Sequence, residues 1–115
     1  MSIDQLLEIL KGELVTECEK EEFCIERGFA SDLMSDVLTI PSTDKLALIT
    51  GLSNLQTIRT AEMAGINMII IVRGKKCTPD MISLAEDNDI VLIETPYSAF
   101  HTSAILFNAG IKPLF

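Results

Sequence analysis

The chain has 115 residues, of which 48% are hydrophobic, and this suits one compact domain because typical domains hold ~100 to 150 residues. Its formal net charge is −8, which argues against nucleic acid or an anionic membrane as main partner, since both are bound through clustered Lys and Arg. The longest apolar stretch, INMIIIV, is far shorter than the ~20 residues of a membrane span, and Asp4 and Glu8 stand where a signal peptide would carry positive charge. We therefore expect a cytoplasmic protein without a membrane partner.

Cysteine usage agrees with that location. Cys18, Cys24 and Cys77 are odd in number and fit neither C-x-x-C nor a Cys/His ligand spacing. We expect reduced thiols, no metal site and no cofactor.

The N-terminal quarter predicts a helix followed by short strands. Ser2 and Gln5 form a capping-box pattern, and apolar residues then recur at helical spacing until Gly12. The segments ELVTEC and EFCIERGF alternate charged with β-branched or aromatic residues, which indicates one or two short strands. Six of the 17 acidic residues fall between Glu13 and Glu26, a pattern typical of a solvated acidic face.

A second helix is predicted over DLMSDVLTI. Ser31 would be its N-cap, Asp32 would lie in the favourable first turn, and Pro41 would end it. Leu33, Met34, Val37 and Leu38 would form its apolar stripe. Asp32 and Asp36 would then share one face and could hold a cation, although two carboxylates alone make a weak site.

From residue 45 onward, strands and helices alternate. KLALIT predicts a buried strand, and Ser53 with Gln56 repeats the capping box before an amphipathic helix that runs to Gly65. NMIIIV is the most apolar strand, which places it near the middle of the sheet. CTPDMISLAEDND predicts a helix capped by Thr78, IVLIE a strand, and SAFHTSAILFNAG a last helix that ends at Gly110.

This β-α-β-α-β-α order with short connections predicts a mostly parallel sheet with right-handed crossovers. The expected fold is a three-layer α/β/α single domain over residues 1–115, with the helix and acidic segment of residues 1–23 packed on it.

Ligands of open parallel sheets bind outside the carboxyl ends of the strands, where helix N-termini supply N–H donors and partial positive charge. Here that rim would carry small hydroxyl residues, capped helix starts and the cations of the RGKK run, and it could accept an anion. The segment TGLS fits an ordinary tight turn and cap equally well, RGKK fits a solvated loop, and Tyr97 and Phe100 are spaced like core aromatics. The candidate ligand-binding residues are Ser31, Asp32, Thr50, Gly51, Ser53, Asn54, Arg73, Gly74, Lys75, Thr95 and Tyr97.

Catalytic motifs are absent from the sequence. It contains no G-x-x-x-x-G-K-[ST], no G-x-G-x-x-G and no G-x-S-x-G. Its single histidine, His101, lies inside the last predicted helix, where packing or solvent exposure is the ordinary role. We therefore expect no catalytic residues and a protein that is not an enzyme.

Four stretches resemble a known family: GFASDLMSDVL, LITGLSNLQTIRTAEMAGINMIIIVRGKK, LAEDNDIVLIETPYSAF and the closing NAGI. From about Cys24 to Ile111 the sequence is similar to a stand-alone DRTGG domain. The literal D-R-T-G-G string is absent, and its nearest counterpart is the segment from Thr50 to Ser53. The family fold is similar to the N-terminal domain of the bifunctional HPr kinase/phosphorylase, but the resemblance implies no kinase activity because the P-loop is missing here.

The resemblance implies a regulatory module, assembled as a homodimer or larger oligomer, with adenine nucleotides or phosphorylated metabolites as possible effectors. The first interpretation is a non-catalytic sensor that binds a small anionic ligand at the rim, using the helix start at Ser53 and Asn54 with Arg73 and Lys75 as charge partners. The alternative is an interaction subunit that docks a separate enzyme through its acidic or RGKK surface. A mean hydropathy of +0.34 also favours a homodimer, since apolar surface tends to be hidden in an interface.

Overall fold

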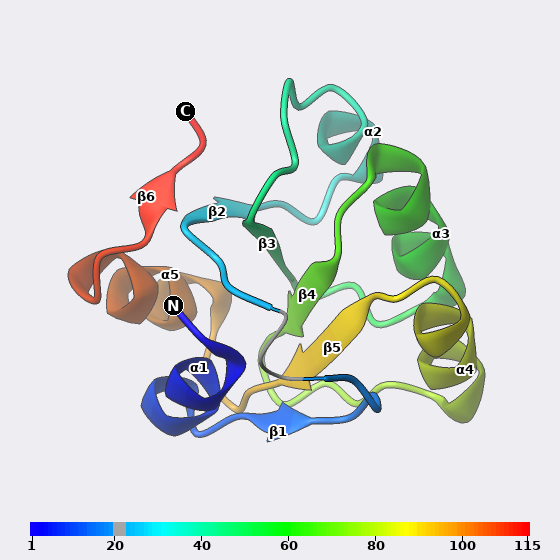
Figure 1. Ribbon diagram of the computed structural model, residues 1–115, viewed down its shortest axis with the longest axis horizontal. Helices are drawn as coiled ribbons and strands as arrows, with labels where there is room; N and C mark the ends of the chain where they lie inside the picture. Colours follow the sequence, from blue (N-terminus) through cyan, green and yellow to red (C-terminus); the bar gives the residue numbers. More distant parts are fainter. Residues whose placement is uncertain (20–22) are drawn as a thin grey trace.

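The computed structural model describes residues 1–19 and 23–115 as one α/β unit (Figure 1). Its described part contains five helices and six strands, and the strands form one sheet in the order β1-β5-β4-β3-β2-β6. In chain order the elements are α1 (Ile3–Leu10), β1 (Glu13–Leu14), β2 (Arg27–Ala30), α2 (Met34–Val37), β3 (Leu46–Thr50), α3 (Leu55–Ala64), β4 (Met68–Ile71), α4 (Pro79–Asp87), β5 (Val91–Glu94), α5 (Ala99–Asn108) and β6 (Lys112–Pro113).

Helices cover both faces of the sheet, which confirms the predicted three-layer α/β/α fold. Helices α1 and α5 pack on one face, and α2, α3 and α4 pack on the other. The pairs β6–β2, β2–β3, β3–β4 and β4–β5 are parallel, and β1 is the only one of the described strands that runs antiparallel to its neighbour, β5. As predicted, β4 lies inside the sheet, between β5 and β3.

Each central strand contributes to two cores at once. In β4, Ile70 belongs to the core beneath α1 and α5, while Ile69 and Ile71 belong to the core beneath α2, α3 and α4. All residues of β3, β4 and β5 are buried. Strands covered on both faces are apolar without interruption, which is why these three segments could be identified from sequence.

The first helix is capped as predicted. The Gln5 N–H donates to the Ser2 hydroxyl at 3.2 Å, and the Ser2 N–H donates to the Gln5 side chain at 2.9 Å. The predicted strands then reduce to β1 and β2, which begin at Glu13 and Arg27. The part of that prediction that falls on residues 20–22 lies outside the described residues.

The second predicted helix is wrong at its start. It has a single turn, its N-cap is Leu33, and the Ser31 hydroxyl accepts from the Leu33 N–H at 3.0 Å instead of capping the helix. Asp32 precedes the helix, so the predicted pairing of Asp32 with Asp36 on one helical face is wrong too. Of the four apolar residues, only Val37 is buried; Leu33 and Leu38 are exposed by 56% and 50%. The physical reason lies in the Asp32 side chain, which bonds to the next strand end.

The capping box predicted at Ser53 is also wrong. Asn54 is the N-cap of α3, and its side chain accepts from the Thr57 N–H at 2.9 Å. The Ser53 hydroxyl instead donates to the backbone oxygen of Lys76. Thr78 caps α4 as predicted, Ser98 caps α5, and Gly65 ends α3 in a left-handed conformation with φ 78°.

Candidate ligand-binding rim

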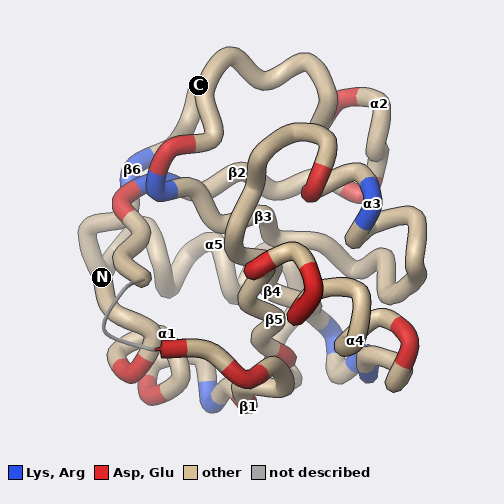
Figure 2. The backbone as a smooth tube through the Cα atoms, turned by 45° about the vertical axis from the view of Figure 1, so that its right-hand side comes forward, with Lys and Arg blue, Asp and Glu red and all other residues tan. Residues whose placement is uncertain are grey.

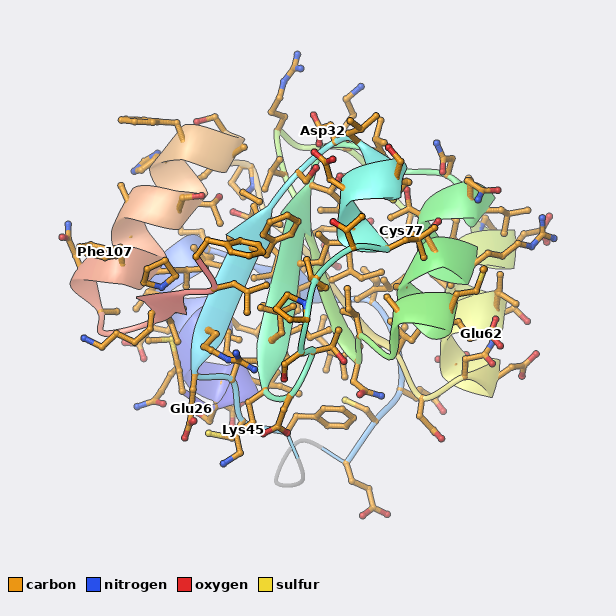
Figure 3. The ribbon with its side chains drawn as sticks, turned by 90° about the horizontal axis from the view of Figure 1, so that it is seen from above. Glu26, Asp32, Lys45, Glu62, Cys77 and Phe107 are labelled. Atoms are coloured by element: carbon orange, nitrogen blue, oxygen red, sulfur yellow. The ribbon has the colours of Figure 1, made fainter. Side chains whose placement is uncertain are left out.

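Four loops meet at the carboxyl edge of the sheet. They follow β2, β3, β4 and β5, and together with Thr50, the last residue of β3, they carry every candidate residue predicted from the sequence. Figure 3 shows Asp32 at this edge and Glu26 and Lys45 at the opposite edge, where β2 and β3 begin. The parallel topology therefore gathers residues that are up to 66 positions apart in the sequence, from Ser31 to Tyr97.

Asp32 already occupies part of the predicted anion site. Its carboxylate oxygen Oδ1 accepts from the Gly51 N–H at 2.8 Å and from the Thr50 hydroxyl at 2.9 Å. The Thr50 hydroxyl in turn accepts from the Leu52 N–H at 3.2 Å. A carboxylate of the chain thus stands where a bound anion would meet the Gly51 N–H, and it adds negative charge there. Thr50 and Gly51 form a turn fixed by Asp32.

Positive charge gathers in the loop after β4, residues 73–76, which we call the basic loop. Arg73 and Gly74 both have left-handed backbones, with φ 64° and 70°, and a non-glycine residue rarely takes this conformation. The Arg73 N–H donates to the backbone oxygen of Tyr97 at 2.7 Å, and the Gly74 N–H donates to the backbone oxygen of Thr95 at 3.0 Å. These bonds fix the backbone, while the side chains of Arg73 and Lys75 are exposed. Neither cation forms an ion pair with any residue that the structure describes.

Lys76 differs from these two cations because Glu94 neutralises it. The ammonium lies 3.4 Å from the Glu94 carboxylate, whose side chain is only 8% exposed. The other Glu94 oxygen accepts from the Cys77 N–H at 2.6 Å. Glu94 therefore anchors the end of the basic loop. The sequence analysis missed this role of Glu94. A single acid at the end of an apolar strand, after a cationic run such as RGKK, could have indicated an ion pair between the two.

A small hollow of about 220 Å³ lies beside this anchor, between the basic loop and the turn after α1. It is lined by residues of both signs: Lys11, Glu13, Gly74, Lys76, Glu94, Thr95 and Pro96. Thr95 is buried, and its hydroxyl donates to the Leu10 oxygen at 2.6 Å and accepts from the Tyr97 N–H at 3.3 Å. In this structure Thr95 connects the rim to α1.

Tyr97 lies at the rim, but one face of its ring is covered. The ring stacks on His101 with 4.2 Å between centroids and 33° between planes. Tyr97 also packs against the core beneath α1 and α5, so it is a partly buried aromatic residue as its spacing suggests. The same interpretation is wrong for Phe100, which is 86% exposed because α5 turns that side chain outward.

The environment of Cys77 suppresses its reactivity. Burial, followed by the charge and hydrogen bonding of the nearby Glu94 carboxylate, raises the pKa of the Cys77 thiol to about 12. Because only the thiolate is nucleophilic, we expect iodoacetamide to modify Cys77 far more slowly than the exposed Cys24 at pH 8. Mass spectrometry after timed labelling measures both rates in one sample. Equal rates at the two cysteines would contradict this assignment.

No metal centre is evident among residues 1–19 and 23–115, where no three His, Cys, Asp or Glu side chains come together. In the same part of the chain, every helix is too short or too polar to cross a membrane.

The fold and this edge define the class: a three-layer α/β/α domain whose strand ends present a cationic loop. The family model described as DRTGG domain matches residues 5–109. The chain belongs to the DRTGG domain family, which confirms the resemblance seen in the sequence.

One solved structure extends this comparison. It is described as the "CBS and DRTGG domains of the regulatory region of Clostridium perfringens pyrophosphatase complexed with activator, diadenosine tetraphosphate". The similarity has a TM-score of 0.78 at 19% identity, and it covers 98% of this chain but 48% of that chain. This chain therefore spans about half the length of that regulatory region. A comparison with curated proteins found no match.

Proposed function

We propose that this DRTGG domain is a non-catalytic regulatory module that binds a small anionic ligand, an adenine nucleotide or a phosphorylated metabolite, at the carboxyl edge of its sheet. The basic loop carries the proposal. Arg73 and Lys75 are exposed cations without an ion pair in the described part of the chain, and they stand on a backbone that is hydrogen-bonded to the neighbouring loop. In a protein of net charge −8, two such cations at a strand end match a phosphate group.

The comparison structure supports a nucleotide as the class to test first. The Clostridium perfringens pyrophosphatase region is described as bound to diadenosine tetraphosphate, an activator, and one of its two kinds of domain is a DRTGG domain. Phosphate chains carry several negative charges close together, which suits a pair of cations separated by one residue.

Roles within the rim follow from the hydrogen bonds. Arg73, Gly74 and Lys75 would contact the ligand, and the start of α3 at Ser53 and Asn54 would add the partial positive charge of a helix N-terminus. The other candidates act on the backbone of the rim. Asp32, Thr50 and Gly51 fix the turn before α3. The backbone oxygens of Thr95 and Tyr97 fix the basic loop, and Ser31 bonds to Leu33 in the loop after β2.

Reversal of one charge tests this assignment. A thermal-shift series with AMP, ADP, ATP, diadenosine tetraphosphate and pyrophosphate should show selective stabilisation, since a ligand at 100 times its dissociation constant adds roughly 2.7 kcal/mol. We expect Arg73→Glu to abolish the shift because it replaces a cation by an anion at the site. The exposed side chain of Lys45, which Figure 3 places at the opposite edge of the sheet, gives the matched control Lys45→Glu, which should keep the shift. No shift with any of the five compounds, or an unchanged shift in Arg73→Glu, would refute the proposal.

The second candidate function is an interaction subunit that docks a separate enzyme. Three exposed acids between Gly12 and residue 20 favour it: Glu13, Glu17 and Glu19. Native co-purification separates the two functions, because docking requires a stable partner that is lost when Glu13 and Glu19 are both changed to Lys, whereas a sensor requires none.

A further inference from the structure

An apolar groove of about 400 Å³ runs between α5 and the edge of the sheet formed by β2 and β6. Figure 1 shows α5 beside these two strands. The groove exists because β2 turns its smallest side chains toward α5. A Cβ added to Gly28 would meet Ile111 at 3.5 Å and Ile49 at 3.8 Å, and Ala30 continues the floor.

Two large aromatic side chains stand on the same helix beside this groove. Phe100 and Phe107 both line it, and their side chains are exposed by 86% and 64%. A separation of seven residues is two helical turns, so both project from one face of α5. Figure 3 shows Phe107 on the outer side of the molecule. Exposed apolar groups that gather beside a groove are typical of a protein interface.

Charge sets this face apart from the rest of the surface. The chain contains 23% charged residues, yet there is no Asp, Glu, Lys or Arg from Pro96 to Ile111. Figure 2 shows the tube of α5 without red or blue. Lys112 is the charged residue that lines the groove. Two copies of net charge −8 can therefore approach through this face without local repulsion, and Lys112 is opposite in sign to the approaching copy.

We propose that this face is the interface between two copies of the chain, with Phe100 and Phe107 of each copy inserted into the groove of the other. A two-fold interface uses the same patch twice, so side chains that project from the patch need a hollow on that same patch to receive them. Here the groove and the two exposed Phe side chains lie side by side. A different protein as partner would need only the groove or only the projecting side chains.

The required area and the edge strand define how the copies meet. A stable dimer buries about 800 Å² on each partner, and the chain has a surface of 6108 Å². The interface must therefore extend from α5 across the groove to β6. Pro113 in β6 lacks an N–H donor, which disfavours continuation of the sheet into the second copy. Side-chain packing of α5 into the groove is the geometry that remains.

The test is the oligomeric state of the whole chain, measured by sedimentation over a micromolar concentration series. We expect the wild type to have twice its chain mass of 12.7 kDa. Phe100→Glu should raise the dimer dissociation constant by about 30-fold or more, the effect of losing a central interface residue. Because the Phe100 side chain is so exposed, the variant should fold, and circular dichroism checks this. Phe107→Glu provides an independent second variant.

Met63→Glu is the matched control. Met63 is 72% exposed on α3, across the sheet from α5, and the substitution makes the same change of charge. We expect it to remain dimeric. A wild type that stays monomeric throughout the series would overturn the proposal. The groove would then be free to hold a small apolar ligand or another protein instead of a second copy. A dimer that both Phe variants leave intact would also overturn it, since the copies would then meet elsewhere.

Discussion

Replacement of Ile70 by alanine should lower the free energy of unfolding by about 4 kcal/mol, near the upper end for buried Ile-to-Ala changes. Ile70 is fully buried in β4, an interior strand, and it packs in the core beneath α1 and α5. The substitution removes three carbon atoms whose space cannot be refilled, because the side chain is held between a sheet and two helices. Such a loss is a large part of the 5–15 kcal/mol typical of a domain.

Urea unfolding followed by circular dichroism measures this change directly. Met63→Ala is the control, because a side chain exposed by 72% should change stability by no more than about 0.5 kcal/mol. Ile70→Val should fall between them, at about 1 kcal/mol. A loss below 1 kcal/mol for Ile70→Ala would show that the sheet does not hold this side chain as described.

The elements that could be predicted from sequence are those whose burial or capping leaves a pattern in their own residues. LALIT, MIII and VLIE are each buried along their whole length, and their apolar runs, which give way to a polar residue only at Thr50 and Glu94, reflect helices on both faces. Thr78 and Ser98 cap helices through bonds to residues three positions later, Met81 and His101, so the local pattern contained the necessary information.

The wrong predictions depend on partners that are distant in the sequence. Ser53 lies next to a helix start, but its hydroxyl bonds to Lys76, 23 positions away, and the cap passes to Asn54. Asp32 leaves the second helix because its carboxylate is held by Thr50 and Gly51 at the end of β3. The two-residue strands β1 and β6 are defined by the sheet edges that they join, and no periodicity can be seen in two residues.

The candidate rim could be predicted from the sequence only in part. Parallel topology alone places the predicted loops at one edge, and the structure has all of them there. What the pattern could not show is which charges are already satisfied. Asp32 holds the Gly51 N–H and Glu94 holds Lys76, so the available positive charge is concentrated on Arg73 and Lys75.

Glu94→Ala is the second substitution with a large expected effect, a loss of about 2 kcal/mol in the free energy of unfolding. The Glu94 side chain is 8% exposed, and it accepts the Cys77 N–H at 2.6 Å while it lies 3.4 Å from the Lys76 ammonium. Removal of a charged acceptor leaves a half-buried N–H without its partner, and bonds to charged groups contribute about 1.5–3 kcal/mol. Glu94→Gln keeps an acceptor oxygen and should lose less.

The thiol of Cys77 reports the same anchor independently of stability. Because the Glu94 carboxylate contributes to raising the pKa of Cys77 to about 12, Glu94→Gln should lower that pKa and speed alkylation of Cys77 at a fixed pH. The thiol should still be slower than an ordinary one, since burial is the largest cause of the shift and is unchanged. Glu62→Ala, on the exposed face of α3, should alter neither stability nor labelling rate. Unchanged stability in Glu94→Ala, together with unchanged Cys77 labelling in Glu94→Gln, would mean that Glu94 does not hold the basic loop at this strand end. The proposed anion site depends on a loop that holds Arg73 and Lys75 in place, so it would then lose its physical basis.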